Sequence, residues 1–222
     1  NTPAYDTAGN IGLYPRNDPK IIEGIIRYFG FTQEQLQSYI SVEKVNEEKK
    51  LKLNFIPYCK LIDLLESHID IQGRLTKSVL KKLSKFPSNN KDYFVANSSP
   101  KTTAEFKRIT EETSDSKGWY FLFKIIEEMQ VKIGFEDFVE LSDSIAPRLF
   151  TIGSCFKKQQ NVIVMASIIE NGLISKFFNS NPEGMKAELR KSSFNDAMKW
   201  KKVIFISVGT GFAPFRGYLQ EK

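Results

Sequence analysis

The closing segment, residues 201–222, reads KKVIFISVGTGFAPFRGYLQEK and constrains the fold more than any other stretch. Five of the six residues in 203–208 are apolar, which predicts a buried strand. Gly209, Thr210 and Gly211 follow, and then a helical pattern begins. A strand, a glycine turn and a helix start present bare backbone N–H groups to a phosphate. The sequence therefore predicts the opening of a nucleotide-binding α/β unit here.

The cysteine and histidine content limits the chemistry that the chain can perform. It contains two cysteines, Cys59 and Cys155, and one histidine, His68. A structural zinc site takes four such ligands, so we predict no metal site in this chain. On a helix the nine positions from Cys59 to His68 span about 13 Å, too far for a nucleophilic pair. So few free thiols favour a reducing compartment, and we expect an intracellular, cytoplasmic location.

Charge and hydropathy limit the kinds of partner that the chain can bind. The net charge is +6, from 32 basic and 26 acidic residues. The lysines alternate with glutamates, as in SVEKVNEEKKLKL, which favours a solvated surface, and we expect no nucleic-acid partner. No apolar run approaches the roughly 18–20 residues that cross a bilayer, so we expect no membrane segment in this chain. A membrane tether outside this chain is left open. The chain starts at Asn1, and we expect an excerpt of a longer polypeptide.

A well-capped helix pattern follows a short strand-like stretch, IGLYP. Asp18 is a suitable N-cap, Pro19 a suitable first helical residue and Gly30 a suitable end, with isoleucines at helical spacing between them. A second helix is predicted to open at Pro57. Its apolar face would consist of Leu61, Ile62, Leu64, Leu65 and Ile69. Between the two helices we expect two extended segments around a charged turn.

The remaining patterns change from helical to strand-like. LTKSVLKKLSKF, TTAEFKRITEE and GWYFLFKIIEEM predict helices separated by polar loops. RLFTIGSC, NVIVMASIIE and KKVIFISV then predict strands, with a helix after Gly172. The fold class predicted from this order is mixed β and α.

Two further segments carry groups suited to a cofactor. In PRLFTIGS, Arg148 supplies a guanidinium for a diphosphate, Phe150 a ring for a flat ligand, and Thr151 a hydroxyl for a ring nitrogen. In ENGLISKFF, Gly172 and Ser175 bracket a helix start whose N–H groups suit a phosphate. Each segment alone is more typical of an ordinary strand and a plain helix cap.

Together and in this order, the segments resemble the FAD-binding region of the ferredoxin-NADP reductase-type diflavin reductases. That family includes NADPH-cytochrome reductase, the sulfite reductase flavoprotein and the nitric oxide synthase reductase region. RLFT matches its Arg-x-Tyr/Phe-Ser/Thr motif, GLIS its Gly-x-x-Ser/Thr motif, and GTGFAPF its Gly-Thr-Gly-x-Ala-Pro-Phe motif. YDTAGNIGLYPRN is similar to the family's Tyr-x-x-Gly-Asp turn, with Asn10 in place of the aspartate.

The resemblance implies a specific architecture. We expect a six-stranded antiparallel flavin-binding β-barrel, with its first part in residues 1–71 and its second part in 142–200. A helical connecting insertion would occupy 72–141. The truncated start of a Rossmann-like NADPH lobe would occupy 201–222.

The resemblance also implies site residues and cofactors. Arg148 and Ser175 would hold the FAD diphosphate, with backbone N–H groups around Gly172. Phe150 would stack on the flavin or its ribityl chain. Thr151 would be the catalytic residue, hydrogen-bonded near N5. The other implied cofactor contacts are Leu173 and Ile174 for FAD and Gly209, Thr210 and Gly211 for NADP(H), with FMN bound by a domain outside this chain.

Two functions stay open at this stage. In the first, the chain is the FAD-binding module of an NADPH-dependent reductase that takes hydride onto FAD and passes electrons to FMN or a heme or iron-sulfur partner. Its partner would be a flavodoxin-like FMN domain or another electron acceptor. In the second, it is a catalytically reduced or inactive reductase-fold subunit with a structural role in a larger assembly. Whether the chain itself is an enzyme is left open.

Overall fold

The computed structural model describes residues 3–43, 58–73, 75–89, 92, 94–95, 121–169, 172–180, 184–192 and 201–222. Its contacts form two compact units. Unit 1 combines Asn1–Pro15 with Pro147–Lys222, and unit 2 is Arg16–Ala146. The predicted domain boundaries, after residues 71, 141 and 200, stay predictions.

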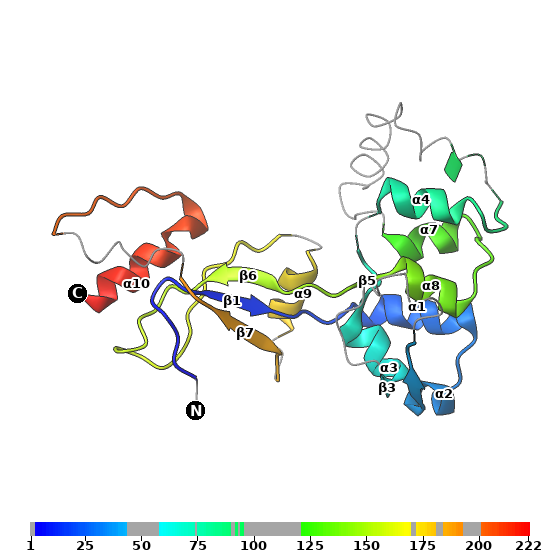
Figure 1. Ribbon diagram of the computed structural model, residues 1–222, viewed down its shortest axis with the longest axis horizontal. Coiled ribbons are helices and arrows are strands. Elements are labelled where there is room, and N and C mark those ends of the chain that lie inside the picture. Colours follow the sequence, from blue (N-terminus) through cyan, green and yellow to red (C-terminus); the bar gives the residue numbers. More distant parts are fainter. Residues whose placement is uncertain are drawn as a thin grey trace. The chain divides into compact units, whose positions relative to one another are not determined.

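Unit 1 is built on a three-stranded antiparallel sheet in the order β6-β1-β7, with β1 in the centre (Figure 1). The strands are β1 (Asn10–Leu13), β6 (Arg148–Thr151) and β7 (Ala187–Arg190). In the register, Asn10 lies between Thr151 of β6 and Arg190 of β7. Strand alternation places Asn10 and Gly12 on one face and Ile11 and Leu13 on the other.

The second face of this sheet faces the apolar core of unit 1. Helix α9 (Leu173–Asn179) contributes Phe178, whose ring centroid lies 5.6 Å from that of Phe150 on β6. The buried members of this core are Tyr5, Ile11, Leu13 and Ile152. The predicted helix after Gly172 and the predicted strand in RLFTIGSC are therefore confirmed.

The end of the chain forms a helix without the strand expected before it. The single-turn 3₁₀ helix η4 (Gly209–Phe212) leads into α10 (Ala213–Glu221). Residues 203–208 pair with no strand among the described residues, and the prediction of a buried strand there is wrong. Phe205 stacks on Phe215 at 4.5 Å, but Ile204, Ile206 and Val208 are 88%, 86% and 92% exposed. A strand needs a ladder partner, and within the described residues this segment has none.

NVIVMASIIE is also less regular than predicted. Over its described residues, 161–169, it forms one isolated bridge, between Val164 and Ile152, and no continuous strand. Its backbone bonds instead to the loop after β6: Ile163 donates to the Ser154 hydroxyl and accepts from the Gly153 N–H. A side chain thus takes one of the positions that a neighbouring strand would fill.

Unit 2 is mainly helical. Among its described residues, the α-helices are α1 (Pro19–Phe29), α2 (Gln33–Gln37), α3 (Leu61–Asp63), α4 (Lys77–Leu83), α7 (Leu122–Glu128) and α8 (Phe135–Leu141) (Figure 1). The predicted caps of α1 are confirmed: Asp18 accepts from the Lys20 N–H, and Gly30 ends the helix at φ 70°. TTAEFKRITEE lies outside the described residues, whereas α4 and α7 confirm the other two helical patterns.

The helix predicted to open at Pro57 differs from the structure, which describes residues from Tyr58 onward. Strand β3 (Tyr58–Lys60) pairs with β2 (Tyr39–Ser41), and α3 continues into the π-helix η1 (Leu64–His68). Asn17 explains the wider turn. Its Nδ2 donates to the carbonyls of Leu65 and Ile69, both at 2.7 Å, while the Ile69 N–H bonds to Leu64. The Asn17 side chain thus bonds to the Leu65 carbonyl, which would accept from the Ile69 N–H in an α-helix.

A third sheet joins β4 (Ile69–Asp70) to β5 (Asp143–Ser144). Ile69 therefore belongs to a strand, although it is buried as predicted. The core of unit 2 brings together α1, η1, α4, α7 and α8, and its fully buried large side chains include Ile25, Leu64, Leu65, Leu80, Phe94, Ile125, Ile126 and Phe138.

The mixed β and α class is confirmed, and all the sheets are antiparallel. None of the three sheets closes on itself among the described residues, so the six-stranded barrel is not observed. No helix in the described part of the chain combines the length and apolarity needed to span a membrane.

Candidate functional site

Strand β6 presents three of the predicted site residues. Arg148 lies opposite Leu13, Phe150 opposite Ile11 and Thr151 opposite Asn10. All three predicted side chains are half-buried. By alternation Arg148 and Phe150 share the face toward the core, and Thr151 lies on the other face. One short strand thus carries the guanidinium, the ring and the hydroxyl.

The second predicted segment forms a tight turn before α9. The Gly172 N–H donates to the Ile169 carbonyl at 3.0 Å, and the Ser175 hydroxyl accepts from the Ile169 N–H at 3.0 Å. A Cβ at Gly172 would lie 3.2 Å from the Ile169 oxygen and 3.3 Å from Ser175 Oγ, so a side chain would crowd this turn. Ser175 is 2% exposed, while Leu173 and Ile174 are half-buried. Ile174 packs against the core of unit 1.

The glycine turn 209–211 is exposed, and its geometry requires glycine at one position. Gly209 has φ +56°, in the left-handed region that favours glycine. The turn closes with a bond from the Gly211 N–H to the Val208 carbonyl at 3.1 Å.

Helix α10 packs on the residues that follow β6. A Cβ at Gly153 would lie 3.2 Å from the Ala213 carbonyl oxygen, and Arg216 donates to the Gly153 carbonyl. Further along, Lys157 donates to Glu221 at 3.0 Å, and this hydrogen bond lowers the pKa of the Glu221 carboxyl. The start of α10 therefore contacts a residue only two positions beyond Thr151.

Asn10, which the sequence marked only as a departure from the family pattern, contacts Thr151 directly. The Thr151 hydroxyl donates to Asn10 Oδ1 at 3.3 Å across β1 and β6. Both side chains are half-buried. The pairing register that brings them together depends on the sheet, so no local sequence pattern identifies this bond.

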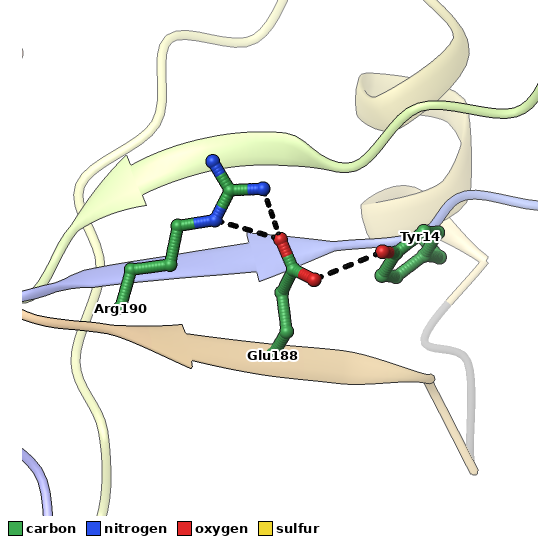
Figure 2. Close-up of polar contacts among 3 residues, drawn as sticks. All are labelled: Tyr14, Glu188 and Arg190. Carbon is green, nitrogen blue, oxygen red and sulfur yellow. Dashed lines mark hydrogen bonds and ion pairs between the residues drawn. The ribbon is translucent and has the colours of Figure 1, made fainter. Parts of the chain in front are cut away.

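A polar cluster lies on the same face at β1 and β7 (Figure 2). Tyr14 donates to Glu188 Oε2 at 3.0 Å, and Arg190 donates to Glu188 Oε1 through Nε at 2.8 Å and through Nη2. Lys186 lies 4.9 Å from the centre of the Tyr14 ring. Burial and the Glu188 carboxylate raise the pKa of Tyr14, and the bonds from Tyr14 and Arg190 lower the pKa of Glu188.

A second network fixes the loop after β6. Tyr5 Oη lies 2.8 Å from Ser154 Oγ and donates to the carbonyls of Gln159 and Asn161 at 2.9 and 3.0 Å. Ser154 also accepts from the Ile163 N–H at 3.0 Å. The tyrosine of the YDTAGN segment thus holds the loop against which α10 packs. No local sequence pattern indicates this role, because the partners of Tyr5 lie about 150 positions away.

The groups gathered in unit 1 fit a flavin dinucleotide. A cation and a hydroxyl suit the diphosphate and the ring nitrogen, and an aromatic ring suits a flat ligand. Gly172 has no side chain of its own at the start of α9, where a Cβ would crowd Ile169 and Ser175. β6 contacts α9 through Phe150 and Phe178, and the loop after β6 contacts α10 at Gly153.

Comparison with known proteins identifies the same class. The family model described as "FAD binding domain" matches residues 2–176. The chain is 26% identical to an NADPH-cytochrome P450 reductase of Dictyostelium discoideum, over 98% of this chain and 34% of that protein. It is 25% identical to a nitric oxide synthase of Anopheles stephensi (98% and 19%) and 22% identical to the sulfite reductase [NADPH] flavoprotein alpha-component of Buchnera aphidicola (98% and 34%).

The chain thus spans about a third of the length of the reductases that it matches. The family match covers most of the chain, including RLFT and GLIS. The resemblance predicted from those motifs is confirmed, and the chain belongs to the FAD binding domain family, in its diflavin reductase branch.

Proposed function

We propose that this chain is the FAD-binding module of an NADPH-dependent flavoprotein reductase. In this function hydride passes from NADPH to FAD, and electrons then pass to FMN or to a heme or iron-sulfur partner. The observation that carries the proposal is the convergence of three motif segments on β6. Phe150 contacts Phe178 of α9, and Gly153 contacts the start of α10 behind the glycine turn. Segments that bind the hydride donor and the flavin must lie close together for hydride transfer.

The residues of β6 and α9 would hold FAD. Arg148 would neutralise the diphosphate, because a guanidinium binds phosphate oxygens in a fork. Ser175, whose oxygen already accepts from Ile169, still has a proton to donate to a phosphate oxygen. Backbone N–H groups of Leu173 and Ile174, which follow Gly172, would complete this contact.

Phe150 would lie against the isoalloxazine or ribityl chain, and Thr151 would contact the N5 edge. Phe150 already packs against Phe178, with the two rings tilted by 55°, so its ring is restrained before any ligand binds. When bound, FAD supplies both the two-electron chemistry and the one-electron chemistry of such a reaction. The protein's part is to orient it and to set its electrostatic surroundings.

Gly209, Thr210 and Gly211 would take part in binding NADP(H). The exposed turn offers backbone N–H groups at the start of α10, where a phosphate is favoured. Residues 201–222 would begin a Rossmann-like lobe.

The finer architecture belongs to the same proposal. The open sheet β6-β1-β7 would form part of an antiparallel flavin barrel built from residues 1–71 and 142–200, with 72–141 as the helical connection. A flavodoxin-like FMN domain or another electron-acceptor protein would be the partner. Relatives are named as reductases of cytochrome P450, as a nitric oxide synthase and as a sulfite reductase component, so the acceptor differs among them.

The test is flavin binding by the purified chain and by its Arg148→Ala variant. We expect the wild type to show flavin absorption or to take up added FAD. Loss of a charge-assisted bond to the diphosphate costs about 1.5–3 kcal/mol, so Arg148→Ala should weaken FAD binding about 10-fold to 150-fold.

Arg27→Ala is a matched control, since it removes the same charge from an exposed site in the last turn of α1. It should leave FAD binding unchanged. A colourless wild type that takes up no FAD would contradict the proposal and favour a structural role in an assembly. Equal weakening by both substitutions would show that Arg148 acts only through net charge.

A further inference from the structure

The hydrogen bond between Thr151 and Asn10 determines what the Thr151 oxygen can offer a ligand. Thr151 donates its proton to Asn10 Oδ1 at 3.3 Å, and the two residues are paired in the β1–β6 register. A hydroxyl has one proton and two lone pairs. With the proton held by Asn10, the Thr151 oxygen is left to accept a hydrogen bond.

The opposite neighbour of Asn10 leaves it available for this bond. Arg190 lies across from Asn10 on β7, but its Nε and Nη2 both donate to Glu188 (Figure 2). Glu188 in turn lies over β1 at Gly12, where a Cβ would come within 2.8 Å of Glu188 Cγ. The missing side chain of Gly12 therefore lets Glu188 direct the guanidinium of Arg190 along β7.

We propose that Asn10 is a positioning residue that orients the Thr151 hydroxyl as a hydrogen-bond acceptor toward the flavin. The inference rests on the proposed function, in which Thr151 contacts the N5 edge. Asn10 itself touches Thr151 and acts through it. Its amide oxygen does this without adding a charge to the sheet face.

The orientation of the hydroxyl distinguishes two redox states of a flavin. N5 carries a lone pair and no proton when the flavin is oxidised, and an N–H when it is reduced by two electrons. An oxygen that only accepts can form a hydrogen bond with the N5–H of the reduced flavin. In the oxidised flavin the same oxygen faces the N5 lone pair and forms none. The Asn10–Thr151 pair therefore favours binding of the reduced flavin and raises its midpoint potential.

The test measures the midpoint potential of FAD bound to the wild type, Asn10→Leu, Thr151→Val and the double variant. In Asn10→Leu the Thr151 hydroxyl can rotate and donate to oxidised N5. We expect the preference for reduced over oxidised FAD to fall up to about 10-fold, which for a two-electron couple is about 30 mV. With Val at position 151, Asn10→Leu should produce no further shift, since the hydroxyl through which it acts is absent.

Asn10→Asp is the conservative variant, because it keeps the acceptor oxygen and the shape of the side chain. In that background Thr151→Val should lower the potential, because it removes an accepting oxygen. A raised potential would show that the hydroxyl donates to oxidised N5 and would overturn the inference, even if Asn10→Leu does not fold. A wild type without FAD would overturn the proposed function and this inference together. Bound FAD whose potential is unchanged by Asn10→Leu, or shifts equally with and without the Thr151 hydroxyl, would overturn the inference alone.

Discussion

Removing the Tyr5 hydroxyl should measurably destabilise the loop after β6, against which α10 packs. Tyr5 is 8% exposed, and its Oη contacts the Ser154 hydroxyl and two carbonyls between 2.8 and 3.0 Å. Tyr5→Phe keeps the ring, including its edge contact with Phe156 at 5.2 Å, and removes only the hydroxyl. Ser154 is fully buried, so its hydroxyl loses a partner that water cannot replace.

The expected cost is the net value of a buried hydrogen bond plus the penalty for the partner left behind, about 2 kcal/mol. For a chain of this size that lowers Tm by about 4–8 °C. Urea and thermal unfolding would measure it, and hydrogen exchange at the Ile163 N–H, which bonds to Ser154, would place the effect in this loop. Tyr39→Phe is the control, because Tyr39 is 60% exposed and should change stability by less than about 0.5 kcal/mol.

A double-mutant cycle with Ser154→Ala makes this reasoning testable at the level of the contact. If Tyr5 and Ser154 act as a pair, their combined cost should differ from the sum of the single costs by at least about 0.5 kcal/mol. A Tyr5→Phe variant within about 0.5 kcal/mol of the wild type, or strictly additive variants, would show that the network does not stabilise the loop.

Two further predictions concern other parts of the molecule. Gly24→Ala should destabilise unit 2 by about 1–3 kcal/mol in thermal unfolding, because the new Cβ would lie 2.9 Å from Phe123 Cε1. This clash should outweigh the higher helix propensity of alanine, and a variant as stable as the wild type would refute the tight packing of α1. Glu188→Gln should destabilise the protein most above pH 4.5. The hydrogen bonds from Tyr14 and Arg190 lower the pKa of Glu188 in the folded state, so its contribution to stability is complete above the ordinary pKa of 4.5 and is lost as the pH falls through the lowered pKa. A difference in unfolding midpoint that does not shrink on acidification would contradict this.

Some elements could be predicted because their signals are local. The α1 helix begins and ends as predicted, since Asp18, Pro19 and Gly30 act through the backbone within a few residues. The motif residues of β6 and α9 were recognised for the same reason: their order along the chain is itself the signal. Belonging to the FAD binding domain family was thus predictable from short patterns, and the family match confirms it.

Other features depend on partners distant in the chain. The π-helix η1 forms because Asn17, almost 50 positions before Leu65, takes a carbonyl that an α-helix would use. Residues 203–208 have a strand pattern, but a pattern cannot supply the neighbouring strand that a ladder requires.

By itself the sequence determined the family, the capped helices and the three segments with groups suited to a dinucleotide, because these depend on residue type and short spacing. Only the tertiary structure decided that Asn10 lies beside Thr151, that Glu188 lies over Gly12, and which way the Thr151 proton points. The physical reason is register: a shift of one residue between β1 and β6 would put Asn10 and Thr151 on opposite faces, and the same shift between β1 and β7 would move Glu188 away from Gly12.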